Sequence, residues 1–141
     1  MSKKSVLIAL DKLLEPKKVN QALYKAGLYL EGQIKEKITT LDIVRYGELR
    51  ESITTQMKDN VCVVTCGAEY GIYIEHGTGL FGVRQDYIYP KNKKVLRWLD
   101  ENGREIFAKR TKGQPARPFF YQTLIDKGLE IVKIFKREIN K

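Results

Sequence analysis

The chain has 141 residues, 43% of them hydrophobic, and it carries 26 Lys and Arg against 17 Asp and Glu, a formal net charge of +9. This length suits one domain over residues 1–141 with one core, and no run approaches the roughly 20 apolar residues that a membrane-spanning helix needs. The N-terminus lacks the long apolar stretch of a signal peptide, so we expect the protein to be made and kept in the cytoplasm until it assembles.

The first two predicted elements are helices. Residues 1–15 hold a helical pattern over 4–14, which Pro16 ends or offsets because proline has no backbone N–H to donate. A longer helix is predicted over residues 16–38, where apolar residues recur every three to four positions. The apolar positions of the first helix are Val6, Leu7, Leu10, Leu13 and Leu14. Those of the second are Val19, Ala22, Leu23, Ala26, Leu30, Ile34 and Ile38.

Residues 53–109 are predicted to form a small antiparallel sheet. A short helix is expected around 47–52, followed by one strand over 53–57 and a second over 61–66. Asp59-Asn60 lies between these strands and suits the positive φ angles of a tight hairpin turn. The first half of the sheet is therefore a hairpin.

A second hairpin is predicted further along. Its strands cover 95–99 and 105–109, and they flank Glu101-Asn102-Gly103, in which Asn-Gly is a strong turn signal. Between the two hairpins, residues 79–92 show neither helical nor alternating periodicity. We expect this stretch to be an extended loop.

The last predicted element is a helix over residues 118–140. It follows a second loop over 110–117 and opens with Pro118, a residue that suits the first turn of a helix. The predicted fold class is therefore α+β: a long N-terminal helix and a C-terminal helix packed on a small antiparallel β-sheet, with long loops.

The two cysteines are expected to be reduced. Cys62 and Cys66 lie four apart on a predicted strand, which separates their Cα atoms by roughly 13 Å, beyond the ~7 Å limit for a disulfide. Two thiols and a single histidine also fall short of the four ligands of a structural zinc site. No metal site is predicted.

Charge is distributed unevenly along the chain. Residues 84–117 hold ten Lys and Arg against four Asp and Glu, whereas residues 38–83 hold three against six. The basic segment can attract nucleic acid, meet an acidic patch on a neighbouring subunit, or serve only as a solvated surface. These three interpretations stay open at this point.

The run Gly77-Thr78-Gly79-Leu80-Phe81-Gly82 matches the G-x-G-x-x-G fingerprint of dinucleotide-binding proteins. That fingerprint binds a pyrophosphate only between a buried strand and a helix, and no amphipathic helix follows here. We therefore predict no cofactor. Gly77 and Gly79 instead allow another segment, of this chain or of a neighbour, to approach closely. Glu75 and His76 are not predicted to form a catalytic pair, because no candidate nucleophile accompanies the single histidine.

Three short motifs stand in a fixed order along the chain. They are Tyr46-Gly47-Glu48-Leu49-Arg50-Glu51-Ser52-Ile53, the run from Tyr70 to Gly79, and Arg117-Pro118-Phe119. Together with a sheet between two helices, they resemble the small tail-completion, or head-to-tail joining, proteins of long-tailed bacteriophages. The resemblance spans about residues 19–135, and Tyr46 stands where that family has Thr.

The resemblance implies a structural protein, not an enzyme. It implies a homo-oligomeric ring, commonly sixfold, in the neck or tail of the virion, assembled in the host bacterial cytoplasm. Its neighbours would be connector, tail-terminator or tail-tube proteins, and genomic DNA would pass through its lumen without sequence-specific binding. No catalytic residue, cofactor or membrane is expected.

Candidate residues follow from the motifs and from the loops at 79–92 and 110–117, which are expected to carry the assembly contacts and to order only on docking. The predicted interface residues are Tyr73, Glu75, His76, Gly77, Thr78, Gly79, Phe81, Arg84, Tyr87, Arg110, Lys112 and Arg117. The predicted structural residues are Gly47, Leu49, Ser52, Pro118 and Phe119.

Three alternative functions stay open beside the joining ring. One is a tail terminator of the same virion region, which shares size and broad architecture with a joining protein. A second is a nucleic-acid-binding protein that uses the basic residues 84–117. The third is a small nucleotide-binding enzyme, which would depend on Gly77 and Gly79.

Overall fold

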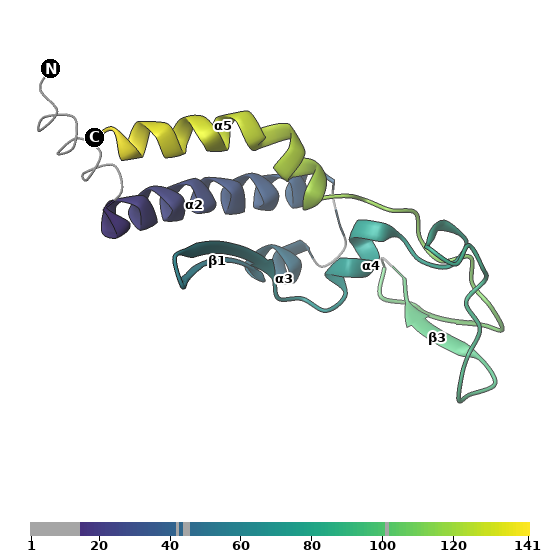
Figure 1. Ribbon diagram of the computed structural model, residues 1–141. Coiled ribbons are helices and arrows are strands. Elements are labelled where there is room, and N and C mark those ends of the chain that lie inside the picture. The colour runs from purple at the N-terminus through teal and green to yellow at the C-terminus, as the bar shows by residue number, and fades with distance from the viewer. Residues whose placement is uncertain (1–14, 42, 44–45, 101) are drawn as a thin grey trace, which may run out of the picture.

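The computed structural model describes residues 15–41, 43, 46–100 and 102–141, and it confirms the α+β class (Figure 1). The helix predicted over 4–14 lies outside the described residues. In chain order the elements are α2 (Pro16–Thr40), α3 (Tyr46–Glu51), β1 (Ile53–Lys58), β2 (Val61–Cys66), α4 (Gly71–His76), the 3₁₀ turn η1 (Gly79–Phe81), β3 (Leu96–Leu99), β4 (Glu105–Ala108) and α5 (Tyr121–Ile139).

The helix α2 lies between α5 and the β1–β2 hairpin, so the body of the protein has three layers (Figure 1). Pro16 occupies its first turn, where the missing N–H costs nothing. Gly27 faces the hairpin, and a Cβ on it would collide with the side chains of Cys62 and Thr55. A small residue at this position therefore lets the hairpin pack closely on the helix.

The hydrophobic core lies where α2, α3, β1 and the start of α5 meet. Its buried members are Leu30, Ile34, Ile38, Ile43, Leu49, Ile53 and Phe119. Phe119 comes from the motif that precedes α5, and Leu49 comes from α3. Two of the motifs singled out in the sequence thus contribute directly to the core.

The prediction of one central sheet was wrong. The strands form two separate antiparallel hairpins, β1–β2 and β3–β4. Both turns are as expected, since Asp59 and Asn60 have φ of 50° and 66° and Gly103 has φ of 78°. Helix α4 and the loop after it fill the sequence between the hairpins and carry the second one away from the first (Figure 1).

Residues 77–117 leave the body and form a projection, which we call the arm (Figure 1). It contains η1, the β3–β4 hairpin and the two predicted loops. An isolated bridge pairs Ile88 with Thr111, with hydrogen bonds of 2.9 and 3.0 Å in the two directions. The loops, which are far apart in sequence, are therefore joined within one chain.

Helix α5 begins at Tyr121 and not at Pro118 as predicted. The side chain of Phe119 enters the core, and the amides of Phe119 and Phe120 bind the carboxylate of Glu75. These contacts hold the chain outside the helix for three more residues. Pro118 is exposed and lies before the helix, not in its first turn.

Candidate functional site

Glu75 connects the arm to the body. It lies on α4, only 7% of its surface is exposed, and its carboxylate accepts hydrogen bonds from the amides of Phe119, Phe120 and Tyr121 at 3.0, 2.9 and 3.0 Å. Amides at the start of a helix have no partner inside it, and an anion there also interacts favourably with the helix dipole. Glu75 therefore caps α5, and the prediction that it lies at an exposed interface does not fit its burial.

The glycine motif forms a backbone clamp between the two loops of the arm. The amides of Thr78 and Leu80 donate to the carbonyls of Gln114 and Lys112, each at 2.8 Å. The amide of Gln114 returns a bond of 2.9 Å to the hydroxyl of Thr78. The two loops are therefore paired with each other within the chain. This pairing does not fit the expectation that they order only on docking.

Positive φ angles make glycine necessary at this clamp. Gly77, Gly79 and Gly113 have φ of 79°, 62° and 84°. A Cβ on Gly79 would collide with the carbonyl oxygen of Lys112, and one on Gly113 with that of Thr78. The segment that approaches the glycines thus belongs to the same chain. The amides of Gly77, Thr78, Leu80, Phe81 and Gly82 donate to carbonyls of the same chain, so these donors are not free to bind a pyrophosphate.

The β3–β4 hairpin is the least covered part of the arm. Trp98, Leu99 and Phe107 are 37%, 54% and 59% exposed. A hollow of about 620 Å³ separates this hairpin from α4, and Tyr73 and Arg117 line it. The backbone amide of Arg117 donates to the carbonyl of Ile74 at 2.8 Å, while its side chain has no ion pair in the described part of the chain.

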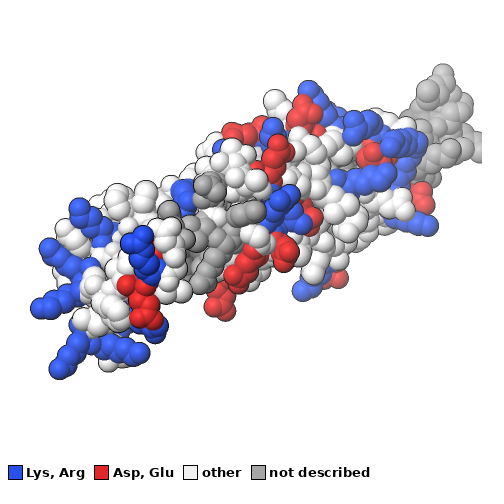
Figure 2. Space-filling view, turned by 180° about the vertical axis from the view of Figure 1, so that it is seen from behind, with Lys and Arg blue, Asp and Glu red and all other residues white. Residues whose placement is uncertain are grey.

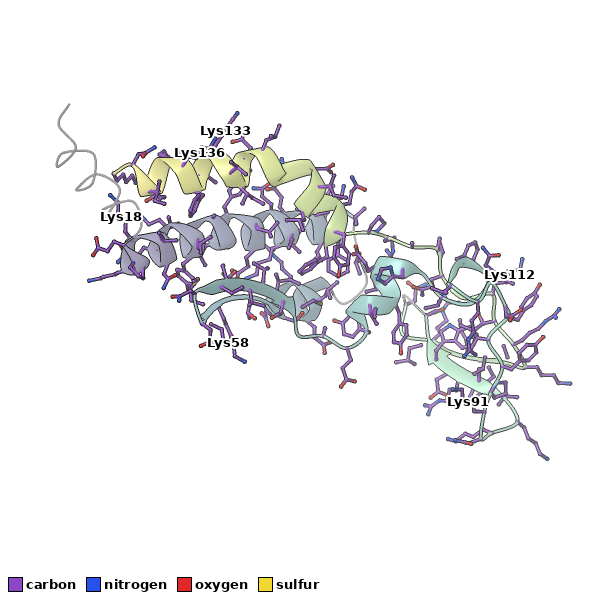
Figure 3. All side chains as sticks on the ribbon, viewed as in Figure 1. Lys18, Lys58, Lys91, Lys112, Lys133 and Lys136 are labelled. Atoms are coloured by element: carbon purple, nitrogen blue, oxygen red, sulfur yellow. The ribbon has the colours of Figure 1, made fainter. Side chains whose placement is uncertain are left out.

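The arm carries most of the basic surface that the sequence indicated. Figure 2 shows Lys and Arg at the arm end of the molecule and also at the opposite end, and Figure 3 shows Lys91 and Lys112 pointing outward on the arm. Among the described Lys and Arg side chains of 84–117, only that of Arg97 forms an ion pair, and its partner is Glu105. The guanidinium of Arg110 lies 4.1 Å above the ring of Tyr87, which positions it on the arm.

The predicted interface residues divide into three groups by exposure. Tyr73, His76, Phe81, Arg84, Arg110 and Lys112 are exposed. Thr78, Gly79, Tyr87 and Arg117 are half-buried, and Glu75 and Gly77 are buried. The exposed members lie on α4 and the arm, and the buried ones hold the arm to itself and to the body.

The predicted structural residues also differ in what they do. Leu49 and Phe119 are buried in the core, and the Ser52 hydroxyl donates to the Leu49 carbonyl at 2.6 Å at the end of α3. Gly47 is exposed, and a Cβ on it would meet nothing within 4 Å. Nothing in the described structure requires glycine at that position.

Two features of the surface were missed from the sequence. One is the exposure of Trp98 and Phe107 on the arm. The other is an apolar face of α5 whose side chains are exposed. The members of this face are Tyr121, Leu124, Ile125, Leu129 and Val132. Their spacing of three and four was visible in the sequence, but it ran alongside the core pattern of Ile131, Ile134 and Phe135.

The two cysteines are free, as expected, and both are half-buried on β2. Burial raises the pKa of the Cys62 thiol, which keeps it protonated. In the described ranges no group of His, Cys, Asp and Glu side chains could hold a metal ion. No helix there combines the length and apolarity needed to cross a membrane.

Comparisons of the chain with protein-family models, with curated proteins and with solved structures found no significant match.

Proposed function

We propose that this chain is a structural virion protein that assembles as a ring, of six copies, in the neck or tail of a long-tailed bacteriophage. In this role it joins the head connector to the tail tube and leaves a passage for the genome. The contacts between copies are head-to-tail, so each subunit offers two different surfaces that close by rotation.

The observation that carries this proposal is the exposure of large apolar side chains on both faces of the β3–β4 hairpin, with Trp98 on one face and Leu99 and Phe107 on the other. Trp98, Leu99 and Phe107 are exposed on a two-stranded hairpin. Such a hairpin is marginally stable by itself in water, and exposed aromatic residues are typical of protein interfaces. The arm is therefore suited to packing on another protein chain, while the clamp at Gly79 keeps its shape fixed before that contact.

A second observation supports the resemblance behind the proposal. The position that a Cβ on Gly71 would take lies 3.4 Å from Leu49 Cδ1 and 3.6 Å from Phe119 Cζ. These three residues come one from each of the three motifs. Motifs that lie 22 and 48 positions apart in the chain thus meet at one joint, as expected of parts of a single structural unit.

The test is the assembly state of the purified full-length protein. Light scattering after size-exclusion chromatography and negative-stain images should show closed annuli. Trp98→Asp with Phe107→Asp should abolish them without unfolding the subunit. Val61→Asp is the matched control, because Val61 is 56% exposed on the other hairpin. A wild-type protein that stays monomeric at its highest soluble concentration, alone and with tail-tube or connector proteins, would contradict the proposal.

A nucleic-acid-binding function is favoured by one observation, the unpaired basic residues of the arm (Figure 3). It predicts that the isolated monomer binds DNA with an affinity that falls steeply with salt, because bound cations are released from phosphates. Fluorescence anisotropy with short duplex and single-stranded DNA at several salt concentrations measures this. Binding that Lys91→Glu with Lys112→Glu removes would favour this function over the ring.

A further inference from the structure

The exposed apolar face of α5, which we call the α5 stripe, has no cover within the described part of the chain. Ile125 and Leu129 at its centre are 73% and 79% exposed. Its members stand at positions 121, 124, 125, 129 and 132, the spacing of one helix face. Burying such an apolar face contributes more free energy than a surface ion pair does, so we expect a partner helix to pack on it.

The stripe also contains a groove on which a second helix can pack. Gly128 lies within it, and a Cβ on Gly128 would meet nothing within 4 Å. A glycine in the middle of a row of larger side chains leaves a groove into which the ridge of another helix can pack. From Tyr121 to Val132 the stripe covers eleven residue steps, about 16 Å.

Residues 4–14 have the matching sequence. They carry Val6, Leu7, Leu10, Leu13 and Leu14 at helical spacing, and as a helix these eleven residues would measure about 16 Å. The apolar positions of this segment run from Val6 to Leu14, eight residue steps or about 12 Å, so the segment can cover most of the length of the stripe.

The position at which this segment joins α2 limits how much of the stripe on its own copy it can cover. Glu15 precedes α2, and the start of α2 lies beside the end of α5, where Lys18 Nζ is 2.6 Å from the Lys141 carbonyl and Lys25 is 2.8 Å from Glu138. From Glu138 to Tyr121 is seventeen residues of helix, about 26 Å. A helix of about 16 Å that starts at Glu15 can lie beside Leu129 and Val132 of its own stripe but cannot reach Ile125 or Tyr121, so covering the whole stripe takes a segment from another copy.

We infer that residues 4–14 of one copy pack on the α5 stripe of a neighbouring copy. This inference rests on the proposed ring and adds a second contact to that of the arm. The segment and the stripe are different surfaces, so the contact is head-to-tail and repeats around a ring. One helix on one helix buries on the order of 1,000 Å², the lower limit for a specific interface, so this contact and that of the arm act together.

Disulfide cross-linking of the full-length chain tests the inference. In a background with Cys62→Ser and Cys66→Ser, Leu10→Cys is combined with Leu129→Cys. Oxidation should give a ladder of covalent multimers on non-reducing gels. The control combines Leu10→Cys with Glu130→Cys, which lies one position along α5 on a different face, and it should give at least tenfold less multimer. A pair that closes within one chain, or equal multimer from both pairs, would overturn the inference.

A mixing experiment separates this inference from the proposed ring. One full-length variant carries Leu10→Glu with Leu13→Glu, and the other carries Ile125→Glu with Leu129→Glu. Each should lose annuli alone, and a mixture should give heterodimers, because each variant keeps the half that the other lacks. If both variants still form annuli, the inference is wrong and the ring stands. If the wild type neither forms annuli nor cross-links, both are wrong.

Discussion

The carboxylate of Glu75 lies 3.0 Å from the backbone nitrogen of Phe119, a residue 44 positions later in the chain. The same side chain accepts two further amides, those of Phe120 and Tyr121. One buried acid thus fixes where the arm returns to the body and where α5 begins. In the described ranges it forms no ion pair, and the amides and the helix dipole supply the favourable interactions of the carboxylate.

Replacing Glu75 should therefore destabilise the whole domain. Glu75→Ala leaves three backbone donors without an acceptor, and we expect a loss of about 3 kcal/mol in the free energy of unfolding. Glu75→Gln keeps one acceptor oxygen and should lose less. Urea denaturation measures both, with the exposed Glu69→Gln as control. Equal stability of Glu75→Ala and the wild type would show that the cap contributes nothing.

The clamp of the arm can be tested at two glycines with similar backbone. Gly79 and Gly103 have φ of 62° and 78°, but a Cβ meets the Lys112 carbonyl at the first and nothing within 4 Å at the second. Gly103→Ala should cost only the left-handed strain, about 1 kcal/mol. Gly79→Ala should cost more and should speed hydrogen exchange at the Thr78 and Leu80 amides. Similar exchange in both variants would contradict the clamp.

Two glycines of α2 should respond in opposite directions to alanine. Gly32 is exposed, and a Cβ there meets nothing within 4 Å, so Gly32→Ala should stabilise the domain by about 1 kcal/mol through helix propensity. Gly27→Ala should destabilise it, because the new methyl group collides with Cys62 and Thr55. Thermal unfolding followed by circular dichroism distinguishes them. A rise in Tm for both variants would mean that the hairpin does not pack on Gly27 as described.

The ends of α2 and α5 should separate more easily in acid. Hydrogen bonds from Lys141 and Lys25, each at 2.8 Å, lower the pKa of Glu138 from 4.5 to about 2. Folding thus favours the ionised form, so Glu138 contributes stability above pH 4.5 and loses that contribution as the pH falls toward 2.

The measurement is the stability difference between the wild type and Glu138→Gln across this pH range. It should be greatest above pH 4.5 and shrink toward zero near pH 2. High salt should reduce it at the upper end, because Lys25 and Lys141 are exposed. A difference that stays constant with pH would mean that ionisation of Glu138 plays no part.

Local patterns were enough to predict α2, α3, α5 and both hairpins with their turns, but not α4 or the residue at which α5 begins. The long helix was predicted from the spacing of its apolar residues. The two turns were predicted from Asp59-Asn60 and Asn102-Gly103, which favour the positive φ angles of tight turns. What could not be predicted was how the pieces pair over long distances. Nothing near Glu75 in sequence indicates that it binds the amide of Phe119, and nothing near Thr78 points to Gln114. Such contacts depend on the folded path of the chain, so a single sequence leaves them hidden.

The candidate site could be predicted only in part, because it too depends on contacts between segments that are far apart in sequence. The glycine motif correctly indicated a close approach of backbone, but its partner could only be seen once the two loops were in place. The apolar residues of α5 were recognised as one helix, whereas their division into a core face and an exposed face needed the position of α2. Exposure of Trp98 likewise depends on how far the second hairpin lies from the body.

The backbone enters the arm at Gly77 and leaves it at Arg117. The backbone bond from Arg117 to Ile74, 2.8 Å long, ties these two connections together. A mechanical load that passes along the backbone from the arm reaches the body through this pair, and two residues after Arg117 it meets Phe119, which is fully buried. Tension on the arm is thus passed to the hydrophobic core before it reaches α2.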